Sequence, residues 1–288
     1  VASEDYESIS KVFHENVANI EAFNAEGIHG YTQGINAFTH MTPEEFHEYT
    51  EMGRNKRAKT VEEEAFHNTM PIHVVSDRKK RNLAESNPDD FDWRTVANVV
   101  TDVKNQGQCG SCWTFGATGS LEGAYALMSG NPPTRNPNDA STFGSVSDGF
   151  NGFSEQNFAD CDKYSDSCDG GDVTTAFVYA AQFGGVPSEK SYPYEYIDGP
   201  TKPMKTCQTT VTRDDVVLNT AVRLDYPYTR VKPYSILDLE NALLQQPISI
   251  SVQAGPTAAG GKQPWQTYTG GIITLEDGCA QTLDHAVL

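Results

Sequence analysis

The most constraining feature of this 288-residue chain is the separation of its cysteines from its histidines. All six cysteines lie between Cys109 and Cys279, whereas six of the seven histidines lie before residue 74. The exception is His285. Any chemistry in the cysteine-bearing part that needs an imidazole must therefore use this one histidine. The distribution also indicates two parts, of which only the second carries cysteine chemistry.

The N-terminal part has the pattern of two helices followed by a linker. Apolar residues recur every three or four positions within residues 1–25, which predicts an amphipathic helix. Thr42, followed by Pro43 and two acidic residues, is typical of an N-cap and a second helix start. Residues 53–87 are polar and basic and include the run Arg78–Arg81, which favours an exposed linker open to proteolysis. Such a run is usually a solvated face, and a processing site is the alternative.

The C-terminal part begins near Phe91 and is helical at first. The apolar pattern predicts a helix over 111–129, ended by Gly130. Shorter helices are predicted after Ser154 and after Asp172, the second of them closed by two glycines.

Later segments have the pattern of a loop and of strands. Residues 131–152, rich in Pro, Asn, Ser and Gly, predict a long surface loop. Residues 248–252 alternate between apolar and polar, and residues 270–274 follow a glycine turn, so both are predicted strands. Together these elements indicate an α+β domain.

The composition excludes several classes of partner. The net charge of -18 and the pI near 4.7 argue against nucleic acid, because phosphate binding requires a basic surface. No run of about eighteen apolar residues is present, so no membrane span is predicted. The first twenty residues lack the apolar segment of a signal peptide. Either the protein is cytosolic or a signal has been removed.

Cys112 lies where a predicted helix begins. A helix N-terminus carries partial positive charge, and this stabilises a thiolate. A nearby imidazolium would stabilise it further and give the pair that attacks an amide carbonyl at mildly acidic pH. The local sequence Cys109-Gly110-Ser111-Cys112-Trp113 matches the papain and cathepsin signature at every position.

The chain resembles the proenzyme of a papain-like cysteine peptidase, closer to the cathepsin L branch than to the cathepsin B branch. In the first part, Phe13, Asn16, Ile20 and Asn24 have the spacing of the propeptide helix motif. A second propeptide motif is matched at Gly34, Asn36 and Phe38, although His40 stands where aspartate is usual. The matching motifs of the second part, in family order, are Asp92-Trp93-Arg94, Gln106 to Trp113, Phe153-Ser154-Glu155-Gln156, Cys161-Asp162, Cys168-Asp169-Gly170-Gly171, Tyr192-Pro193-Tyr194 and Asp284-His285-Ala286-Val287.

The resemblance assigns catalytic roles by position. Cys112 matches the nucleophile, and His285 matches the general base that becomes the general acid for the leaving amine. Gln106 matches the side chain that forms the oxyanion hole together with the backbone N–H of Cys112. Such a donor typically contributes about 3 kcal/mol to stabilisation of the tetrahedral intermediate.

Binding and structural roles follow from the same resemblance. Gly170 and Gly171 match the stretch whose backbone pairs with an extended substrate, where a missing side chain allows close approach. The residues that match the lining of the pocket for the residue two before the cut are Val173, Ser251, Leu283 and Ala286. This lining is mostly apolar and predicts a hydrophobic substrate residue. The family pattern implies two disulfides, Cys109–Cys168 and Cys161–Cys207.

Two departures from the family stand out. Cys112 and His285 are 173 positions apart, more than the family spacing of about 130–150, and the 131–152 loop explains most of the excess. Loop insertions cost little, because closure entropy grows only logarithmically. No asparagine follows His285 to hold the imidazole, and Cys279 has no implied partner. We therefore expect the sequence to be a fragment of a longer protein.

Other interpretations carry less weight. Cys109 and Cys112 could form a thioredoxin-like redox pair, but no βαβ pattern surrounds them, and a zinc site lacks a second C-x-x-C at the right spacing. A non-catalytic papain-fold binding or inhibitory protein stays open, although Cys112, His285 and Gln106 are all retained. An exopeptidase would need further histidines in the second part.

The sequence thus predicts a papain-like, two-lobed α+β fold, with a helical lobe and a β-barrel-like lobe that is incomplete at its C-terminus. Residues 1–85 would form a helical inhibitory prodomain with its linker, and residues 86–288 the peptidase domain. The expected function is that of a cysteine endopeptidase zymogen, activated at acidic pH by prodomain removal. Its expected partners are protein and peptide substrates and its own prodomain. We expect a monomer without cofactor or metal, secreted or lysosomal/vacuolar because of its disulfides.

Overall fold

The computed structural model describes residues 3–51, 59–76, 88, 91–95, 99–129, 152–199, 203–208, 226–255, 264–274, 277 and 283–288. The chain forms two compact units. The first unit comprises Val1–Arg54 and Ser251–His285, and the second comprises Asn55–Ile250 and Ala286–Leu288. The basic run 78–81, the predicted stop at Gly130 and all but the last residue of the predicted 131–152 loop lie outside the described residues.

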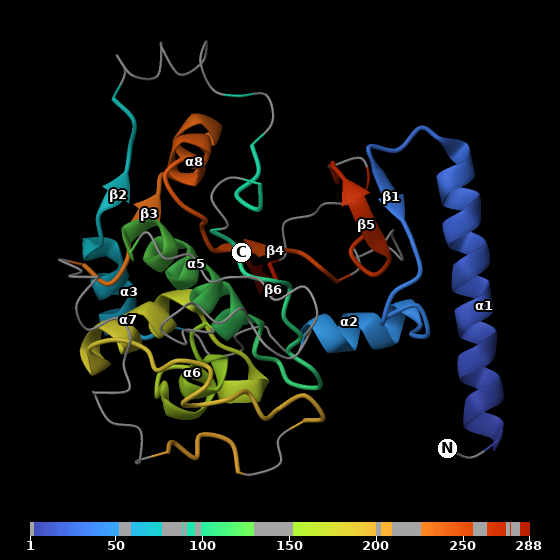
Figure 1. Cartoon of the computed structure of the whole chain (residues 1–288), viewed down its shortest axis with the longest axis horizontal. Helices are drawn as coiled ribbons and strands as arrows, with labels where there is room; N and C mark the ends of the chain where they lie inside the picture. Colours follow the sequence, from blue (N-terminus) through green and yellow to red (C-terminus); the bar gives the residue numbers. More distant parts are fainter. Residues whose placement is uncertain are drawn as a thin grey trace. The chain divides into compact units, whose positions relative to one another are not determined.

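Two helices begin the first unit. α1 (Ser3–Glu26) confirms the amphipathic helix predicted over 1–25, and α2 (Pro43–Glu51) begins at the expected proline (Figure 1). The Glu45 N–H donates to the Thr42 hydroxyl, and the Thr42 N–H donates to the Glu45 carboxylate. This capping box satisfies two N–H groups that the helix itself leaves without an acceptor.

Asparagine side chains fasten α1 to the segment that follows it. The amide of Asn16 donates to the carbonyls of Thr39 and Met41 at 2.8 and 2.9 Å. The side chain of Asn24 exchanges two hydrogen bonds with the backbone of Gln33. The polar positions of this helix therefore determine where the next strand and turn lie.

The first unit also contains a strand pair that is distant in sequence. β1 (Tyr31–Gln33) pairs antiparallel with β5 (Tyr268–Gly271), so that Tyr31 lies opposite Gly271. The strand predicted at 270–274 is thus present, but it begins and ends earlier than expected. Pairing with β1 decides its position.

Three helices form the core of the second unit. α5 (Cys112–Ser129) confirms the helix predicted over 111–129, and it packs on α6 (Glu155–Cys161) and α7 (Val173–Phe183) (Figure 1). The side chains that build this core are Trp113, Ala117, Leu121, Tyr125, Phe153, Phe158, Ala176, Ala180 and Val186. They come from all three helices and from the segments around them, so this core fixes the start of α5.

The two short helices begin where the sequence predicted, and α7 also ends at the predicted glycine. The Ser154 hydroxyl caps α6 by accepting from the Asn157 N–H, and the Asp172 carboxylate caps α7 by accepting from the Thr174 N–H. Gly184 closes α7 in the left-handed conformation, at φ +89°, which glycine adopts without steric cost. A 3-10 turn, η1 (Ser167–Asp169), lies between the two helices.

Within the described residues, the later part of the second unit is less β-rich than the sequence suggested. It contains the short strand β3 (Arg230–Val231), followed by a helix that the sequence analysis missed, α8 (Ile236–Leu243). The missed signal was local, because Ser235 caps this helix by accepting from the Asp238 N–H.

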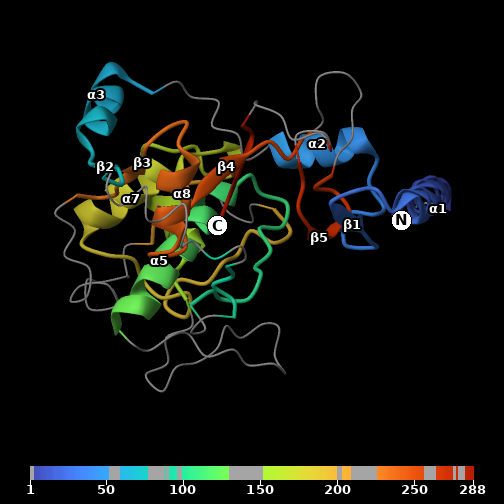
Figure 2. The ribbon, with the colours of Figure 1, turned by 90° about the horizontal axis from the view of Figure 1, so that it is seen from above.

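The expectation that all of 53–87 is a linker is wrong for its described part, although the helix found there has no buried residue and is exposed as predicted. Residues 61–69 form α3 (Val61–Thr69), and β2 (Ile72–His73) pairs in parallel with β3. Figure 2 shows β2 and β3 side by side. The polar composition concealed a capping box between Thr60 and Glu63 and an extended stretch whose partner is distant in sequence.

The remaining strands are β4 (Ile250–Val252) and β6 (His285–Val287), which form a two-stranded sheet. The prediction of a strand at 248–252 is confirmed in its second half. Among the described helices, none is both long and apolar enough to span a bilayer.

Candidate active site

The nucleophile candidate begins a helix. Cys112 is the first residue of α5, is 1% exposed and takes part in neither disulfide. Thr114 donates both its N–H and its hydroxyl to the Ser111 carbonyl, so the first turn of α5 is tightly closed. The thiol group therefore lies in the first turn, where the backbone N–H groups of a helix have no acceptor within the helix.

Two disulfides hold the segments around this helix. Cys109 is bonded to Cys168 and Cys161 to Cys207, the pairs that the family resemblance implied. The first of these joins the loop before α5 to η1, and the Gly110 N–H adds a hydrogen bond to the Cys168 carbonyl. Cys279 lies outside the described residues.

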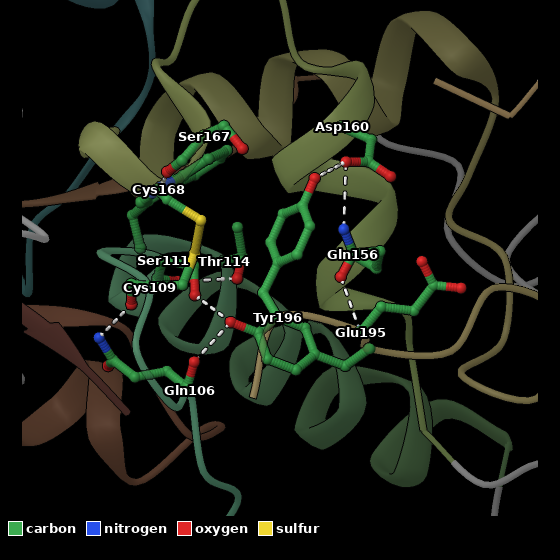
Figure 3. The surroundings of a disulfide bond; sticks show 12 residues. Gln106, Cys109, Ser111, Thr114, Gln156, Asp160, Ser167, Cys168, Glu195 and Tyr196 are labelled. Atoms are coloured by element: carbon green, nitrogen blue, oxygen red, sulfur yellow. Dashed lines mark hydrogen bonds between the residues drawn. A yellow bond between two sulfur atoms is a disulfide. The ribbon is translucent and has the colours of Figure 1, made fainter. Parts of the chain in front are cut away.

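Gln106 has one of its two side-chain donors engaged. Its Nε2 donates to the carbonyl of Cys109 at 2.8 Å, as the labelled side chains beside the disulfide show in Figure 3. An amide nitrogen carries two N–H groups, so the bond that orients the group leaves a second donor for another acceptor. The hydrogen bond to Cys109 therefore fixes the orientation of the Gln106 amide group.

The thiol group of Cys112 contacts the end of the chain within the second unit. The Ala286 N–H donates to Cys112 Sγ at 3.4 Å. A single peptide bond joins Ala286 to His285, the only histidine after His73. The backbone that carries His285 thus passes directly to a residue in contact with the candidate nucleophile.

His285 itself belongs to the first unit and is half-buried. Its Nδ1 is buried and has no hydrogen-bond partner among the described residues. Burial lowers the pKa of His285, and the adjacent Asp284 carboxylate partly offsets this effect. Asp284 accepts from the backbone N–H groups of Ala254 and Gly255, which fixes the residue before the histidine.

The two glycines expected to face substrate have structural roles as well. Gly170 has φ +108°, a conformation that side chains disfavour. A Cβ on Gly171 would come within 2.4 Å of the Trp113 ring. Packing against Trp113 therefore requires glycine at position 171, whatever its role toward substrate.

The four pocket candidates are divided between the units. Val173 and Ala286 lie together in the second unit, because a Cβ on Gly116 would meet both side chains, at 3.5 and 3.6 Å. Ser251 and Leu283 belong to the first unit and are exposed. Of the four predicted lining residues, the structure thus brings Val173 and Ala286 together.

A buried charged cluster near α5 was missed by the sequence analysis. Lys104 Nζ lies 2.6 Å from a carboxylate oxygen of Glu122 and 2.5 Å from one of Glu155. Burial opposes the charge of Lys104, but these two carboxylates outweigh it and raise the pKa of the amine. Burial, together with the charge of Glu155, raises the pKa of Glu189 to about 8. The available signal was Glu122, the only charged residue of α5.

The comparisons with known proteins agree with this geometry. A family model described as "Papain family cysteine protease" matches residues 87–137 and 140–288. The chain belongs to the papain family. A second model, "Cathepsin propeptide inhibitor domain (I29)", matches residues 2–46. The resemblance to a cathepsin L-like proenzyme is thereby confirmed.

Curated papain-family relatives cover nearly all of the chain. It is 30% identical over 281 residues to "Probable cysteine protease RD21B" from Arabidopsis thaliana, an alignment that covers 96% of this chain and 49% of the relative. It is 32% identical over 283 residues to "Cathepsin L2" from Homo sapiens, covering 96% of this chain and 69% of that protein. The chain spans about half the length of the plant papain-family relative.

Solved proenzyme structures share the papain fold. Procathepsin L 3 from the larval midgut of Tenebrio molitor aligns over 99% of this chain and 76% of that chain, with a TM-score of 0.71 and 27% identity. The recombinant stem bromelain precursor aligns over 99% and 74%, with a TM-score of 0.68 and 27% identity. The predicted papain-like α+β class is confirmed.

Proposed function

We propose that this papain-family chain acts as a cysteine endopeptidase zymogen. Residues 1–85 would serve as its inhibitory prodomain and residues 86–288 as its peptidase domain. The propeptide match at 2–46 and the protease match from residue 87 support this division. The substrates are proteins and peptides, and the reaction requires no cofactor or metal.

The hydrogen bond from Ala286 N–H to Cys112 Sγ is the observation that carries the proposal. It ties the residue after His285 to a thiol at a helix N-terminus, which is where a Cys–His pair is required. In the proposed reaction the Cys112 thiolate attacks the scissile carbonyl carbon, and the His285 imidazolium gives its proton to the leaving amine. His285 then takes a proton from water, which attacks the acyl-enzyme. The C–S bond breaks, the acid is released, and the Cys112 thiolate and His285 imidazolium are restored.

Charge develops on the carbonyl oxygen in both steps. The second N–H of Gln106 and the backbone N–H of Cys112 are the proposed donors to it. Burial lowers the pKa of His285, so its imidazolium needs a nearby anion, and the thiolate provides that charge.

Substrate would lie along Gly170 and Gly171, with an apolar side chain directed toward Val173 and Ala286. Ser251 and Leu283 are the further candidates for the lining of this pocket. A hydrophobic residue two positions before the cut is therefore the expected preference.

The prodomain would act as an intramolecular inhibitor that acid releases. Segment 59–76 lies between the two family matches and within the proposed prodomain, and it supports this because it contacts residues of the proposed peptidase domain. Lys59 pairs with Asp172 at 3.0 Å, His67 lies 2.7 Å from the Tyr228 hydroxyl, and β2 pairs with β3. The disulfides favour an oxidising compartment, either secreted or lysosomal/vacuolar, and we propose a monomer.

The test is iodoacetamide labelling of Cys112 at pH 5 on the whole protein after acid treatment, with Cys112→Ser as the control, alongside hydrolysis of a peptide substrate. Rapid labelling is expected, because a thiolate would persist about three pH units below an ordinary thiol pKa. Slow labelling with no hydrolysis, in a folded protein freed of residues 1–85, would contradict the proposal. It would favour a non-catalytic papain-fold binding or inhibitory protein.

A further inference from the structure

A short strap, residues 194–197, holds the loop that leads into α5. The Tyr194 hydroxyl donates to the Gln106 carbonyl at 2.7 Å, and it lies 2.7 Å from the Ser111 hydroxyl. At the other end of the strap, the Gln108 N–H donates to the Ile197 carbonyl at 2.9 Å. Figure 3 shows Gln106, Ser111 and the disulfide on this loop.

The hydrogen bonds at the Tyr194 oxygen have one consistent assignment. A phenol carries a single hydrogen, and here it is donated to the Gln106 carbonyl. The Ser111 hydroxyl must therefore donate to the tyrosine oxygen. One atom thus clamps two positions five residues apart in sequence.

The two clamped positions adjoin the two proposed oxyanion donors. Gln106 carries one donor on its own side chain, and Ser111 is followed directly by Cys112, whose backbone N–H is the other. Two donors stabilise an oxyanion only when they converge on one point without reorganisation. The Tyr194 hydroxyl therefore fixes the distance between the segments that carry these two donors.

The tyrosine is itself held on three sides. Its N–H donates to a Glu189 carboxyl oxygen at 2.7 Å. Its ring meets Phe115 edge-on, with ring centroids 5.1 Å apart, and meets Tyr196 at 6.1 Å. Because Phe115 lies in the first turn of α5, the ring and the hydroxyl bind to the same helix start.

We propose that Tyr194 is a positioning residue that sets the geometry of the oxyanion hole. The inference rests on the proposed function, because it needs Gln106 and the Cys112 N–H as the donors. The Tyr194 hydroxyl bonds to the loop that carries the proposed donors. It acts through the backbone of Gln106 and the side chain of Ser111.

The test is Tyr194→Phe in the whole protein after activation, with kcat, KM and the rate of iodoacetamide alkylation measured at one pH. We expect kcat to fall about five- to tenfold, the loss that one neutral hydrogen bond supports, with KM within about twofold. Alkylation is expected to stay within about twofold of the unmodified protein, because it needs the thiolate and not an oxyanion hole. Ser111→Ala, which keeps the tyrosine, should lower kcat in the same way and by less.

Tyr192→Phe is the matched control. It removes the same atom from the same Tyr-Pro-Tyr motif, but its hydroxyl donates to Asp160 and not to the loop. Its kcat should stay within about twofold at temperatures where it is folded. Unchanged kcat in Tyr194→Phe would overturn the inference, as would equal losses of kcat and alkylation in that variant. Absence of both activities in the unmodified protein would instead refute the proposed function, and this inference with it.

Discussion

The proposed role of Gln106 depends on a single N–H group of its side chain. Its Nε2 donates to the Cys109 carbonyl, and this bond orients the second N–H. We expect Gln106→Ala to lower kcat about 100-fold, as loss of one oxyanion donor does, while alkylation of Cys112 persists. Peptide hydrolysis and iodoacetamide labelling on the same preparations would measure both effects.

The control for this substitution is Gln108→Ala. Gln108 is an exposed glutamine on the same loop, and its hydrogen bond to the Ile197 carbonyl is made by its backbone N–H, which alanine retains. It should leave kcat unchanged. An equal loss in both variants would mean that the loop was disturbed and that no specific donor was lost.

A buried cluster of charged and polar side chains links α5, α6 and the segment before α5. Lys104 bridges Glu122 of α5 and Glu155 of α6, and the Thr118 hydroxyl donates to Glu155. Glu189 lies next to this cluster, and one of its carboxyl oxygens is buried without a hydrogen-bond partner among the described residues. The packing of α5 and α6 is therefore sensitive to the protonation of the carboxyl groups in and beside this cluster.

The Glu189 carboxyl makes stability depend on pH in a defined direction. Burial raises its pKa from 4.5 to about 8 in the folded protein. Between these two values the folded state holds a proton that the unfolded state has lost, so stability falls as the pH rises from 4.5 through 8. Glu189→Gln, which resembles the protonated form, should therefore raise the melting temperature at pH 8 by several degrees and change it little at pH 4.5.

Melting curves of the two proteins across this pH range would measure the effect. Glu195→Gln is the control, because Glu195 is exposed and should show no such difference. A Glu189→Gln variant that melts at a lower temperature than the unmodified protein at pH 8 would contradict the interpretation.

At the scale of the whole molecule, segment 59–76 is a part of the proposed prodomain that contacts the proposed peptidase domain. Burial and the charges of Lys59 and Arg230 lower the pKa of His67 in the bound segment, and the charges of Asp172 and Glu64 oppose them. Because the bound histidine holds its proton less tightly than a free one, binding is strongest above pH 6.5. It weakens as the pH falls through the lowered pKa.

We therefore expect His67→Gln to reduce the dependence of prodomain release on pH. The rate at which residues 1–85 are lost should rise less between pH 6.5 and 5 than in the unmodified protein. His14→Gln is the control, since His14 is exposed on α1. Gel analysis of processing over this range would decide, and an unchanged pH profile in His67→Gln would exclude His67 as a determinant.

Local signals were sufficient for most helices and for the candidate chemistry. The caps at Thr42, Ser154 and Asp172 involve residues within three positions of each other, so the sequence alone located these helix starts. Cys112 at a helix start was foreseeable for the same reason. The same kind of signal at Ser235 was present and was overlooked.

Contacts between residues distant in the chain were decided only by the tertiary structure. β2 is a strand because β3 lies beside it, more than 150 positions away, and β5 begins where β1 allows. The Tyr194 clamp joins residues 88 positions apart, and Lys104 meets a glutamate 51 positions away. The Tyr194 and Lys104 contacts leave no periodic or local pattern in the sequence. Each depends on the packing of elements that are distant in the chain.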